Sequence, residues 1–383
     1  MSTNLHVSLT SFENESRILK ESSSLIDAGF VDRVRVTALG DGKLNEYVDF
    51  DNGRSSAWRI ELRSRKWPRN LLFQGAKYFE YAARVLSHGR DIQATVITIH
   101  SLALLPLGVV AKWLLKARLV YDCHELETET FGLTGLRQNL SRIVERLLIG
   151  HADLVIVVSE SIRRWYADSY GITNIVTVLN CPPYRKPRRT RRLHESLSIP
   201  EDRKIVIYQG GIIKGRGVES LLEAFAGHDD GEHVLVCMGY GDLEGMVKDH
   251  ADRYENIYLQ KAVPPDVVLE YTASADYGVS YIDNPSLNDR YCLPNKLFEY
   301  IMAGLPVIVN DAPEQKRLVK QTGIGVVLGE LSSDSMRGAL GKLASLNNER
   351  LEASIGATAR EYSWENQADV LIKAHRTHLR NGT

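Results

Sequence analysis

The stretch Leu293-Pro-Asn-Lys-Leu-Phe-Glu-Tyr-Ile-Met-Ala-Gly304 predicts a short amphipathic helix that leads directly into a buried strand. The proline suits the first turn of a helix, and Asn295 suits its start. Gly304 is placed to end the helix, and residues 306–310 are expected to form the buried strand. The apolar residues of the helix share one face, and they are Leu297, Phe298, Ile301 and Met302. A helix followed by a buried strand is the unit of a parallel α/β sheet.

Short apolar runs alternate with amphipathic stretches on both sides of this segment, which indicates a mainly parallel sheet with crossover helices. The strands expected in the second half are residues 205–209, 233–238, 257–260, 277–282, 306–310 and 325–328. Those expected in the first half are residues 5–10, 35–39, 95–100, 119–124, 154–159 and 176–180. Helical patterns separate them, for example 104–116 and 161–170. The latter would begin at Ser159 or Glu160 and end at Gly171.

A break interrupts the pattern at Cys181-Pro-Pro-Tyr-Arg-Lys-Pro-Arg-Arg-Thr-Arg-Arg192. Prolines and a run of like charge continue neither a helix nor a central strand, so an interdomain linker is expected here. We therefore predict an α/β protein with two Rossmann-like domains, 1–182 and 183–363, that face each other across a cleft. The last helix, 364–383, is a candidate to cross back to the first domain. Ligands of such sheets bind at the carboxyl ends of the strands.

Composition narrows the class of protein. The 383 residues exceed what one hydrophobic core usually organises, and a formal net charge of -1 argues against a nucleic-acid partner. Four cysteines lie far apart without a C-x-x-C pair, so neither a zinc site nor a disulfide framework is indicated. The N-terminus lacks a signal-peptide pattern, and the longest apolar run, 101–111, is too short to span a bilayer. A cytoplasmic protein is expected.

A glycine-rich loop follows the first strand of the second half, in Ile205-Val-Ile-Tyr-Gln-Gly-Gly-Ile-Ile-Lys-Gly-Arg-Gly217. Glycines let the backbone approach an anion closely, and the helix that begins near Val218 offers free N–H groups. Lys214 and Arg216 add full positive charge. The segment therefore indicates a phosphate site, and the alternative is a tight turn with solvated basic residues.

A second glycine loop, Val234-Leu-Val-Cys-Met-Gly-Tyr-Gly-Asp-Leu-Glu-Gly245, superficially suits a dinucleotide fingerprint. Its spacing is G-x-G-x-x-x-G, and the next expected strand ends in Lys261 rather than in an acidic residue. Because nicotinamide cofactors need that acid for the ribose, we interpret Gly239 and Gly241 as a turn at the ligand site.

The first turn of the opening helix carries one cation and one carboxylate. Lys296 suits a diphosphate, and Glu299 can accept hydrogen bonds from ribose hydroxyls. Helix capping and an ordinary exposed charge pair are the alternative for these two residues alone. Combined with the glycine-rich loop, the ligand site is the better interpretation.

Residues 293–308, 208–224 and 274–282 together resemble the donor domain of the retaining glycosyltransferases of family four, which have the GT-B fold. The Leu-Pro-Asn-Lys-Leu-Phe-Glu-Tyr stretch is the most specific match. Three segments of the first half resemble that family's first strand–loop–helix, its strand ending in Asp-x-His, and its strand before the linker. They are Ser11-Phe-Glu-Asn-Glu-Ser-Arg17 with Gly29, Val120-Tyr-Asp-Cys-His-Glu125 and Thr177-Val-Leu-Asn-Cys-Pro182.

The resemblance implies roles for residues of the second domain. Glu299 would hold the nucleotide ribose, and the diphosphate would be held by Lys296, Arg216 and the backbone of Gly210 and Gly211. Asn295 lies in the same donor-binding stretch, and the backbone near Val263 would face the base.

The resemblance also implies roles in the first domain. His124 would lie close to the transferred sugar, where its neighbours Asp122 and Glu125 either fix its tautomer or cap the next segment. A histidine at a strand end is otherwise most often structural. His100, at the end of the preceding strand, is a second candidate. The acceptor side would comprise Asn14, Arg17, His100 and Glu125.

Two departures from the family pattern concern the donor sugar. The family commonly has two glutamates separated by seven residues, and the position eight before Glu299 is Tyr291. The usual Gly-Arg after the first donor-domain strand is also absent, since Ile212 follows Gly211. These changes affect the expected sugar contacts and leave the ribose and diphosphate contacts in place.

A basic and aromatic segment suggests a membrane contact. Arg63-Ser-Arg-Lys-Trp-Pro-Arg69 precedes an amphipathic stretch, 70–86, that carries Leu72, Phe73, Tyr78, Phe79 and Tyr81. Such residues suit an interfacial helix at the inner face of the cell membrane, or an anionic lipid-linked acceptor. A core-packing helix after a solvated loop is the alternative.

The sequence thus predicts transfer of a hexose from a nucleoside diphosphate sugar, preferably a UDP-sugar such as UDP-glucose, to a hydroxyl of a saccharide or lipid-linked acceptor. Surface polysaccharide or glycoconjugate synthesis is the expected setting. Retention of the anomeric configuration and independence of a metal are implied by the resemblance. No further cofactor is expected. The alternatives are a sugar-nucleotide epimerase and a non-catalytic nucleotide-sugar-binding protein.

Overall fold

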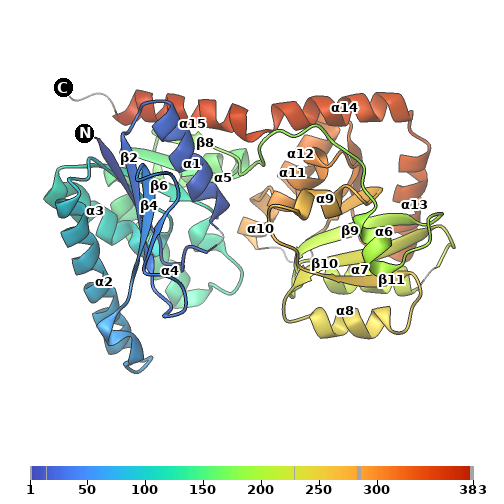
Figure 1. Cartoon of the computed structure of the whole chain (residues 1–383), viewed down its shortest axis with the longest axis horizontal. Helices are drawn as coiled ribbons and strands as arrows, with labels where there is room; N and C mark the ends of the chain where they lie inside the picture. The colour runs from blue at the N-terminus through green and yellow to red at the C-terminus, as the bar shows by residue number, and fades with distance from the viewer. Residues whose placement is uncertain (1, 14, 228, 283–285, 380–383) are drawn as a thin grey trace. The chain divides into compact units, whose positions relative to one another are not determined.

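The computed structural model describes residues 2–13, 15–227, 229–282 and 286–379. Two compact units divide the chain (Figure 1). The first comprises Met1–Val178 together with Gln367–Thr383, and the second comprises Leu179–Asn366. Each unit has its own parallel sheet covered by helices.

The first unit contains, within the described residues, an eight-stranded sheet in the order β3-β4-β2-β1-β5-β6-β7-β8. Its strands are β1 Thr3–Val7, β2 Arg33–Leu39, β3 Tyr47–Asp49, β4 Ser55–Ile60, β5 Val96–Ile99, β6 Arg118–Cys123, β7 Leu154–Val157 and β8 Ile175–Thr177. Every neighbouring pair is parallel except β3 with β4. The order reverses between β1 and β5, which is where such sheets place ligands.

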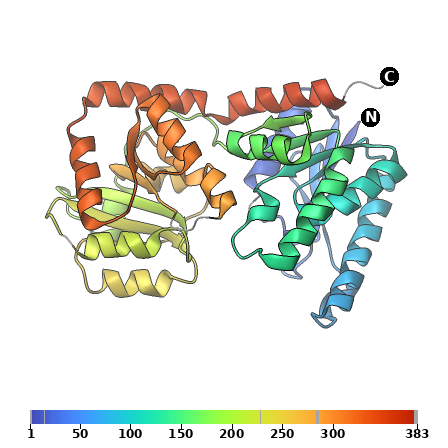
Figure 2. The ribbon, with the colours of Figure 1, turned by 180° about the vertical axis from the view of Figure 1, so that it is seen from behind.

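Helices of the first unit connect these strands as crossovers. They are α1 Ser16–Asp27, η1 Arg63–Lys66, α2 Leu71–Asp91, η2 Leu102–Leu104, α3 Leu105–Leu115, η3 Glu127–Glu129, α4 Gly135–Leu148, η4 Ile149–His151 and α5 Glu160–Tyr170. Right-handed crossovers on either side of the reversal place α1 on one face of the sheet and α2 to α5 on the other. Figure 2 shows this second layer in blue to green.

The second unit contains, over the part described, a six-stranded parallel sheet in the order β11-β10-β9-β12-β13-β14. Its strands are β9 Lys204–Gly211, β10 His233–Tyr240, β11 Ile257–Lys261, β12 Tyr277–Ser280, β13 Val307–Asn310 and β14 Gly325–Leu328. Its helices are α6 Arg192–Leu197, α7 Val218–Ala226, α8 Glu244–Ala251, α9 Val268–Thr272, α10 Leu287–Tyr291, α11 Asn295–Met302, α12 Pro313–Thr322, α13 Ser333–Ala344 and α14 Asn348–Glu361. The order reverses between β9 and β12.

The core of the second unit lies on both faces of this sheet. Side chains of β9 alternate between two apolar clusters, with Ile205 and Ile207 on one face and Val206 and Tyr208 on the other. Helix α11 packs tightly on the first face, because a Cβ on Gly278 would lie 2.3 Å from the Tyr300 ring. This close fit fixes the height of α11 above the sheet, and with it the first helical turn.

The predicted strands are confirmed, each within a few residues of its expected bounds. The predicted cap of α5 is also confirmed, since the Ser159 side chain accepts a hydrogen bond from the Ile162 N–H and Gly171 ends the helix with φ 68°. Strands β3 and β4 were not expected. Helix α11 begins at Asn295, so Pro294 precedes the helix rather than lying in its first turn.

The final helix, α15 Trp364–Leu379, begins in the second unit and continues in the first. The Trp364 N–H donates to the Pro182 carbonyl, whereas the Arg376 guanidinium donates to the Ala28 carbonyl. The His375 ring packs edge-on against Phe30. No helix in the described part of the chain is long and apolar enough to cross a bilayer.

Candidate functional site

In the second unit, the candidate site lies at the carboxyl end of β9, beside the reversal of strand order. Gly210 has φ 119°, which favours glycine. A Cβ on Gly239 would lie 1.9 Å from the Gly210 carbonyl oxygen, and one on Gly241 would lie 2.4 Å from the Ile212 carbonyl oxygen. The two predicted glycine loops therefore pack backbone against backbone, and larger residues would force them apart.

Lys296 is placed at this loop by the first turn of α11. Its Cε lies 3.8 Å from the position that a Cβ on Gly210 would take. Its Nζ lies 3.6 Å from the centre of the Tyr208 ring, is inaccessible to solvent, and has no hydrogen-bond partner among the described residues. Burial, followed by the nearby charge of Arg216, lowers the pKa of Lys296 to about 7. A buried amine without a hydrogen bond is costly, so the site is suited to an anion that supplies one.

Arg216 brings a second cation to the same loop. Its Nη1 lies 3.3 Å from the Oδ1 of Asp289, a buried residue of α10. Asp289 is held in turn by Ser286, whose hydroxyl donates to its Oδ2 at 2.5 Å. The guanidinium is about one third exposed, so part of it remains available to a ligand.

Glu299 lies on the next turn of α11 and is held in one orientation. The side-chain amide of Gln209 donates to its carboxylate, and Thr272 donates to the Gln209 Oε1 at 2.7 Å. The Gln209 N–H donates to the Tyr300 hydroxyl at 3.0 Å. This chain ties the last buried residue of β9 to the carboxylate, which can accept hydrogen bonds from hydroxyl groups of a ligand.

The other candidate residues of the second unit are spread around these two. Asn295 is exposed, and its Oδ1 accepts a hydrogen bond from Asn180 at 3.1 Å. Val263 is half-buried against the core, in the loop after β11. Tyr291 ends α10 and is half-buried.

In the first unit, four polar side chains line up at the carboxyl ends of β1, β5 and β6. His6 Nδ1 lies 2.9 Å from His100 Nε2, and His100 Nδ1 lies 3.1 Å from Asp122 Oδ2. His124 Nε2 lies 2.9 Å from the same carboxylate oxygen. His6, His100 and Asp122 are buried, whereas the His124 side chain is 31% exposed. His124 is therefore the member of this histidine cluster that a ligand can reach.

One set of tautomers satisfies the whole cluster. Asn4 Nδ2 donates to His6 Nε2, His6 Nδ1–H donates to His100 Nε2, and His100 Nδ1–H donates to Asp122. His124 then donates its Nε2–H to Asp122 and keeps Nδ1 for other contacts. Burial lowers the pKa of His6 and of His100, which keeps both neutral. Burial also lowers the pKa of His124, but the Asp122 carboxylate outweighs it and raises that pKa above the usual value.

Arg17 binds the Asp122 carboxylate of the histidine cluster. Its guanidinium donates to both oxygens of Asp122 and to the Val178 carbonyl, and it forms an ion pair with Glu21 at 3.0 Å. Although burial opposes ionisation, Arg17 holds the pKa of Asp122 well below its usual range. Arg17 is itself buried, so its guanidinium binds Asp122 of the histidine cluster and is not exposed to a ligand.

Two further acceptor-side candidates remain. Glu125 is exposed directly after His124. Asn14 lies outside the described residues.

Among the described residues, the ligand atoms of His100, Asp122 and His124 lie close enough together to hold a metal ion. Their ligand atoms lie 2.9 to 3.1 Å apart. The Asp122 oxygen that faces both histidines already accepts from Arg17 Nε at 3.1 Å, however, so a metal ion would have to displace or adjoin a guanidinium. The donor set therefore suits the hydrogen-bonded network better than a metal ion.

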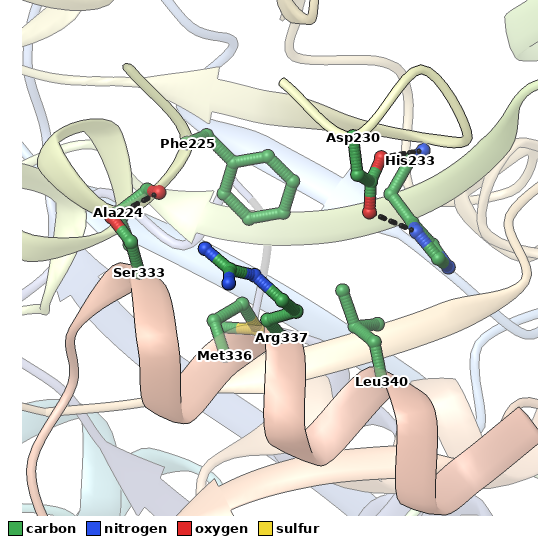
Figure 3. A pocket seen from close by; sticks show the side chains of 8 residues that line it. All are labelled: Ala224, Phe225, Asp230, His233, Ser333, Met336, Arg337 and Leu340. Carbon is green, nitrogen blue, oxygen red and sulfur yellow. Dashed lines mark hydrogen bonds and ion pairs between the residues drawn. The ribbon is translucent and has the colours of Figure 1, made fainter. Parts of the chain in front are cut away.

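A small cavity of about 20 Å³ lies elsewhere in the second unit, between α7, β10 and α13. Figure 3 shows His233 bonded to Asp230 at one side of the cavity, which Phe225 and Met336 also line. His233 begins β10, so this cavity lies at the amino end of the strand, opposite the glycine loops. Its size admits a water molecule and no larger ligand.

Three participants were missed by the sequence analysis: Gln209, Asp289 and His6. Gln209 and His6 lie on buried strands, and a polar residue in an apolar run was the available signal. No local pattern pointed to Asp289. Glu127 was also missed; burial raises its pKa to about 7, which gives the first unit a carboxyl group that titrates near neutrality.

Comparison with known proteins places this architecture. A family model described as "Glycosyl transferase 4-like domain" matches residues 21–182, and one described as "Glycosyl transferases group 1" matches residues 189–362. The chain is 24% identical over 250 residues to a chitobiosyldiphosphodolichol beta-mannosyltransferase of Candida albicans. The aligned segment covers 57% of this chain and 52% of that relative. The chain thus spans about half the length of this curated relative.

Solved structures share the fold at low sequence identity. Sucrose-phosphate synthase from Thermosynechococcus elongatus has a TM-score of 0.75 and 16% identity, with 98% of this chain and 99% of that chain covered. Anabaena HepE, in complex with UDP and glucose, has a TM-score of 0.73 and 13% identity, with 98% and 100% covered. The two family models together take in most of both units. The architecture of this chain agrees with that of the solved structures. The chain belongs to the GT-B superfamily of glycosyltransferases.

Proposed function

We propose that this chain transfers a hexose from a nucleoside diphosphate sugar to a hydroxyl group, with retention of the anomeric configuration. The observation that carries the proposal is the buried, unbonded ammonium of Lys296 against the Gly210–Gly211 loop. A diphosphate would supply the missing hydrogen-bond partner and the opposite charge. Glu299 favours the charged form of this amine, but burial outweighs it, and the Nζ has no hydrogen bond among the described residues.

In the proposed mechanism, stabilisation of the leaving group dominates. As the bond to the sugar breaks, charge develops on the diphosphate, and Lys296, Arg216 and the backbone N–H groups of the glycine loop meet it. Binding of the diphosphate raises the pKa of Lys296, so the amine takes up a proton and becomes a full cation. Glu299, oriented by Gln209, accepts hydrogen bonds from the ribose. Asn295 and the backbone near Val263 complete the nucleotide site.

The first unit would act on the sugar and the acceptor. His124 would donate its Nδ1–H to the transferred hexose, because Asp122 holds its Nε2 and favours the imidazolium. Arg17 and His100 would order Asp122 rather than touch a substrate. The acceptor proton would pass to the departing phosphate oxygen. No metal ion is needed in this scheme.

UDP is the preferred nucleotide, and HepE, which has the same fold, was solved with UDP and glucose. Because the named relative from Candida albicans is a mannosyltransferase, mannose is the first alternative sugar. Tyr291 takes the position where a sugar-contacting glutamate is common. The choice of donor sugar is therefore the part of the proposal with the fewest contacts behind it. A saccharide or lipid-linked acceptor in surface polysaccharide or glycoconjugate synthesis is part of the proposal. So is a location at the inner face of the cell membrane.

Two other functions are weighed by the same experiment. A sugar-nucleotide epimerase would return an isomerised donor, and a binding protein would hold the donor unchanged. The purified chain is incubated separately with UDP-glucose and GDP-mannose, and released nucleotide and donor identity are followed by chromatography. Release of free nucleotide, accelerated by an acceptor mixture, supports the transferase. NMR of the product then reports the anomeric configuration.

Variants link this activity to the site. Lys296→Ala and Glu299→Ala should each lower donor turnover by about a hundredfold or more, since charged groups aimed at a developing charge contribute on this scale. Lys248→Ala and Glu255→Ala, at exposed positions of the same unit, are matched controls and should leave turnover unchanged. Near-wild-type rates in both site variants would overturn the assignment.

A further inference from the structure

Helix α4 presents its apolar side to solvent. Leu136, Leu140, Ile143 and Leu147 recur at spacings of four, three and four, which places them on one stripe. Their side chains are 54 to 78% exposed. In a globular domain such a stripe normally faces the core, so α4 is inverted relative to the usual arrangement.

A buried carboxylate explains why α4 adopts this orientation. Glu145 is fully buried and is the one buried residue of the helix. It accepts hydrogen bonds from the hydroxyls of Tyr121 and Tyr166 at 2.9 Å and of Tyr170 at 2.8 Å. Turning α4 over would leave this carboxylate and three phenols without partners. The orientation is therefore fixed by the fold.

The neighbouring helix extends the apolar surface. Helix α3 packs beside α4 on the same side of the sheet (Figure 2). Its inner side is buried, since a Cβ on Gly108 would meet Leu119 and Ile99. Its outer side exposes three large residues: Val110, Trp113 and Leu114. These and the four residues of the α4 stripe define the α3–α4 face.

The charged side chains that α3 and α4 present at the surface are cations: Lys112, Arg137, Arg142 and Arg146. Asp153 pairs with Lys112 and Glu129 pairs with Arg142, so Arg137 and Arg146 carry the uncompensated positive charge of this face among the described residues. The single acid of the two helices, Glu145, is buried. Helix α2 packs against α3, and its first two residues, Leu71 and Leu72, are exposed shortly after the basic turn η1. An apolar surface bordered by cations is the arrangement that binds an anionic bilayer.

We propose that the α3–α4 face is a docking surface for the anionic leaflet of a lipid bilayer, with the α4 stripe inserted among the acyl chains. A second copy of this chain is a poorer occupant, because pairing two such faces would oppose like charges. The proposal deepens the membrane location proposed above. It assigns the contact to α3 and α4, beyond the basic segment at residues 63–86, and it requires neither a donor nor an acceptor to test.

The test compares sedimentation with vesicles of phosphatidylcholine alone and of phosphatidylcholine with phosphatidylglycerol. The full chain should bind the anionic vesicles, and binding should weaken with added salt, because the lipid–cation attraction is screened. The double variant Leu140→Gln/Ile143→Gln should reduce bound protein at least about tenfold through loss of apolar contact. The double variant Met246→Gln/Leu346→Gln, at exposed apolar positions of the second unit, is the matched control and should bind like the unaltered chain.

Three outcomes would overturn the proposal. They are absence of binding to anionic vesicles, equal binding by both double variants, and dimerisation through this face seen by light scattering without vesicle binding. Circular dichroism verifies that the variants are folded, which is expected because the changed residues are exposed. Donor turnover in detergent-free buffer should be the same in the Leu140→Gln/Ile143→Gln variant, so a failed donor assignment and a failed docking surface give different results.

Discussion

The Lys296 ammonium lies 3.6 Å from the centre of the Tyr208 ring and, within the described residues, has no hydrogen bond. The ring face attracts a cation but replaces only part of the hydration that the amine has lost. The lysine is thus held in a partly destabilised state beside a loop whose backbone suits phosphate. This arrangement makes the state of Lys296 dependent on both pH and ligand.

Lys296→Met should stabilise the unliganded protein most at low pH. The pKa of the lysine falls from 10.5 to about 7 on folding, so between these values the unfolded chain binds more protons and stability rises with pH. Below pH 7 the full cost applies, on the order of 5 kcal/mol at 1.36 kcal/mol per pKa unit. Urea denaturation at pH 6 and pH 10 measures this, and the gain should shrink toward pH 10.

UDP binding should be accompanied by protonation of Lys296. Above pH 7 the diphosphate should draw a proton onto Lys296, so calorimetric titration in two buffers of different ionisation enthalpy should show proton uptake on binding. Lys296→Met should abolish the uptake and weaken UDP. A wild-type protein that binds UDP without proton uptake at pH 8 would contradict the role given to this residue.

Gly239→Ala should damage the ligand loop without touching a ligand. Its Cβ would lie 1.9 Å from the Gly210 carbonyl oxygen, and backbone there has little freedom to move. We expect a loss of about 3 kcal/mol in the free energy of unfolding and a loss of UDP binding. Gly245→Ala, in α8 with open space around it, should instead stabilise by about 0.5 to 1 kcal/mol. Equal effects of the two changes would show that the loops do not pack as described.

The histidine cluster should have a distinctive nitrogen-15 NMR signature. His6 and His100 should remain neutral, with the proton on Nδ1, to a lower pH than an ordinary histidine, because burial lowers both pKa values. His124 should titrate above pH 6.5, because Asp122 raises its pKa. Its favourable charge stabilises the fold at low pH and is lost as pH rises through that raised value. His124→Gln identifies the signals and provides the control. Simultaneous titration of all three rings would contradict the hydrogen-bond network.

The parts of the molecule that could be predicted are those written in local patterns. Buried strands such as 205–209 are continuous apolar runs, and α11 is an amphipathic turn between a proline and a glycine. These patterns gave the two sheets, the linker and the positions of Lys296 and Glu299. The roles of these residues as donor contacts stay predictions until ligands are tested.

The parts that could not be predicted depend on partners far apart in the chain. Arg17 bonds Asp122 across 105 residues, and Gln209 reaches Glu299 across 90. Strand β3 is a short, mostly exposed strand at the edge of the sheet, and β4 beside it is buried but includes Ser55, Ser56 and Arg59, so neither strand shows a clear apolar run. Helix α4 shows the clearest ambiguity. Its amphipathic pattern predicts a helix, but the side that faces inward is decided by three tyrosines that bind Glu145. These tyrosines lie outside the helix, so the periodicity of the helix gives no information about them.

His375 should make the attachment of α15 sensitive to acid. Its ring is buried against Phe30, and its Nδ1–H donates to the Leu371 carbonyl. Burial lowers its pKa from 6.5 to about 4, so between these values the unfolded chain takes up a proton that the folded chain refuses. Stability contributed by the neutral ring is therefore present above pH 6.5 and lost as pH falls toward 4, by about 3 kcal/mol in total. His375→Leu should keep the apolar contact and remove this loss, so its melting temperature should exceed that of the unaltered chain more at pH 5 than at pH 7.5. His378→Leu, one turn on and partly exposed, is the control and should show no such dependence. If the two variants respond to pH alike, the acid sensitivity of the first unit lies instead with His6 and His100, whose pKa values are lowered by the same burial.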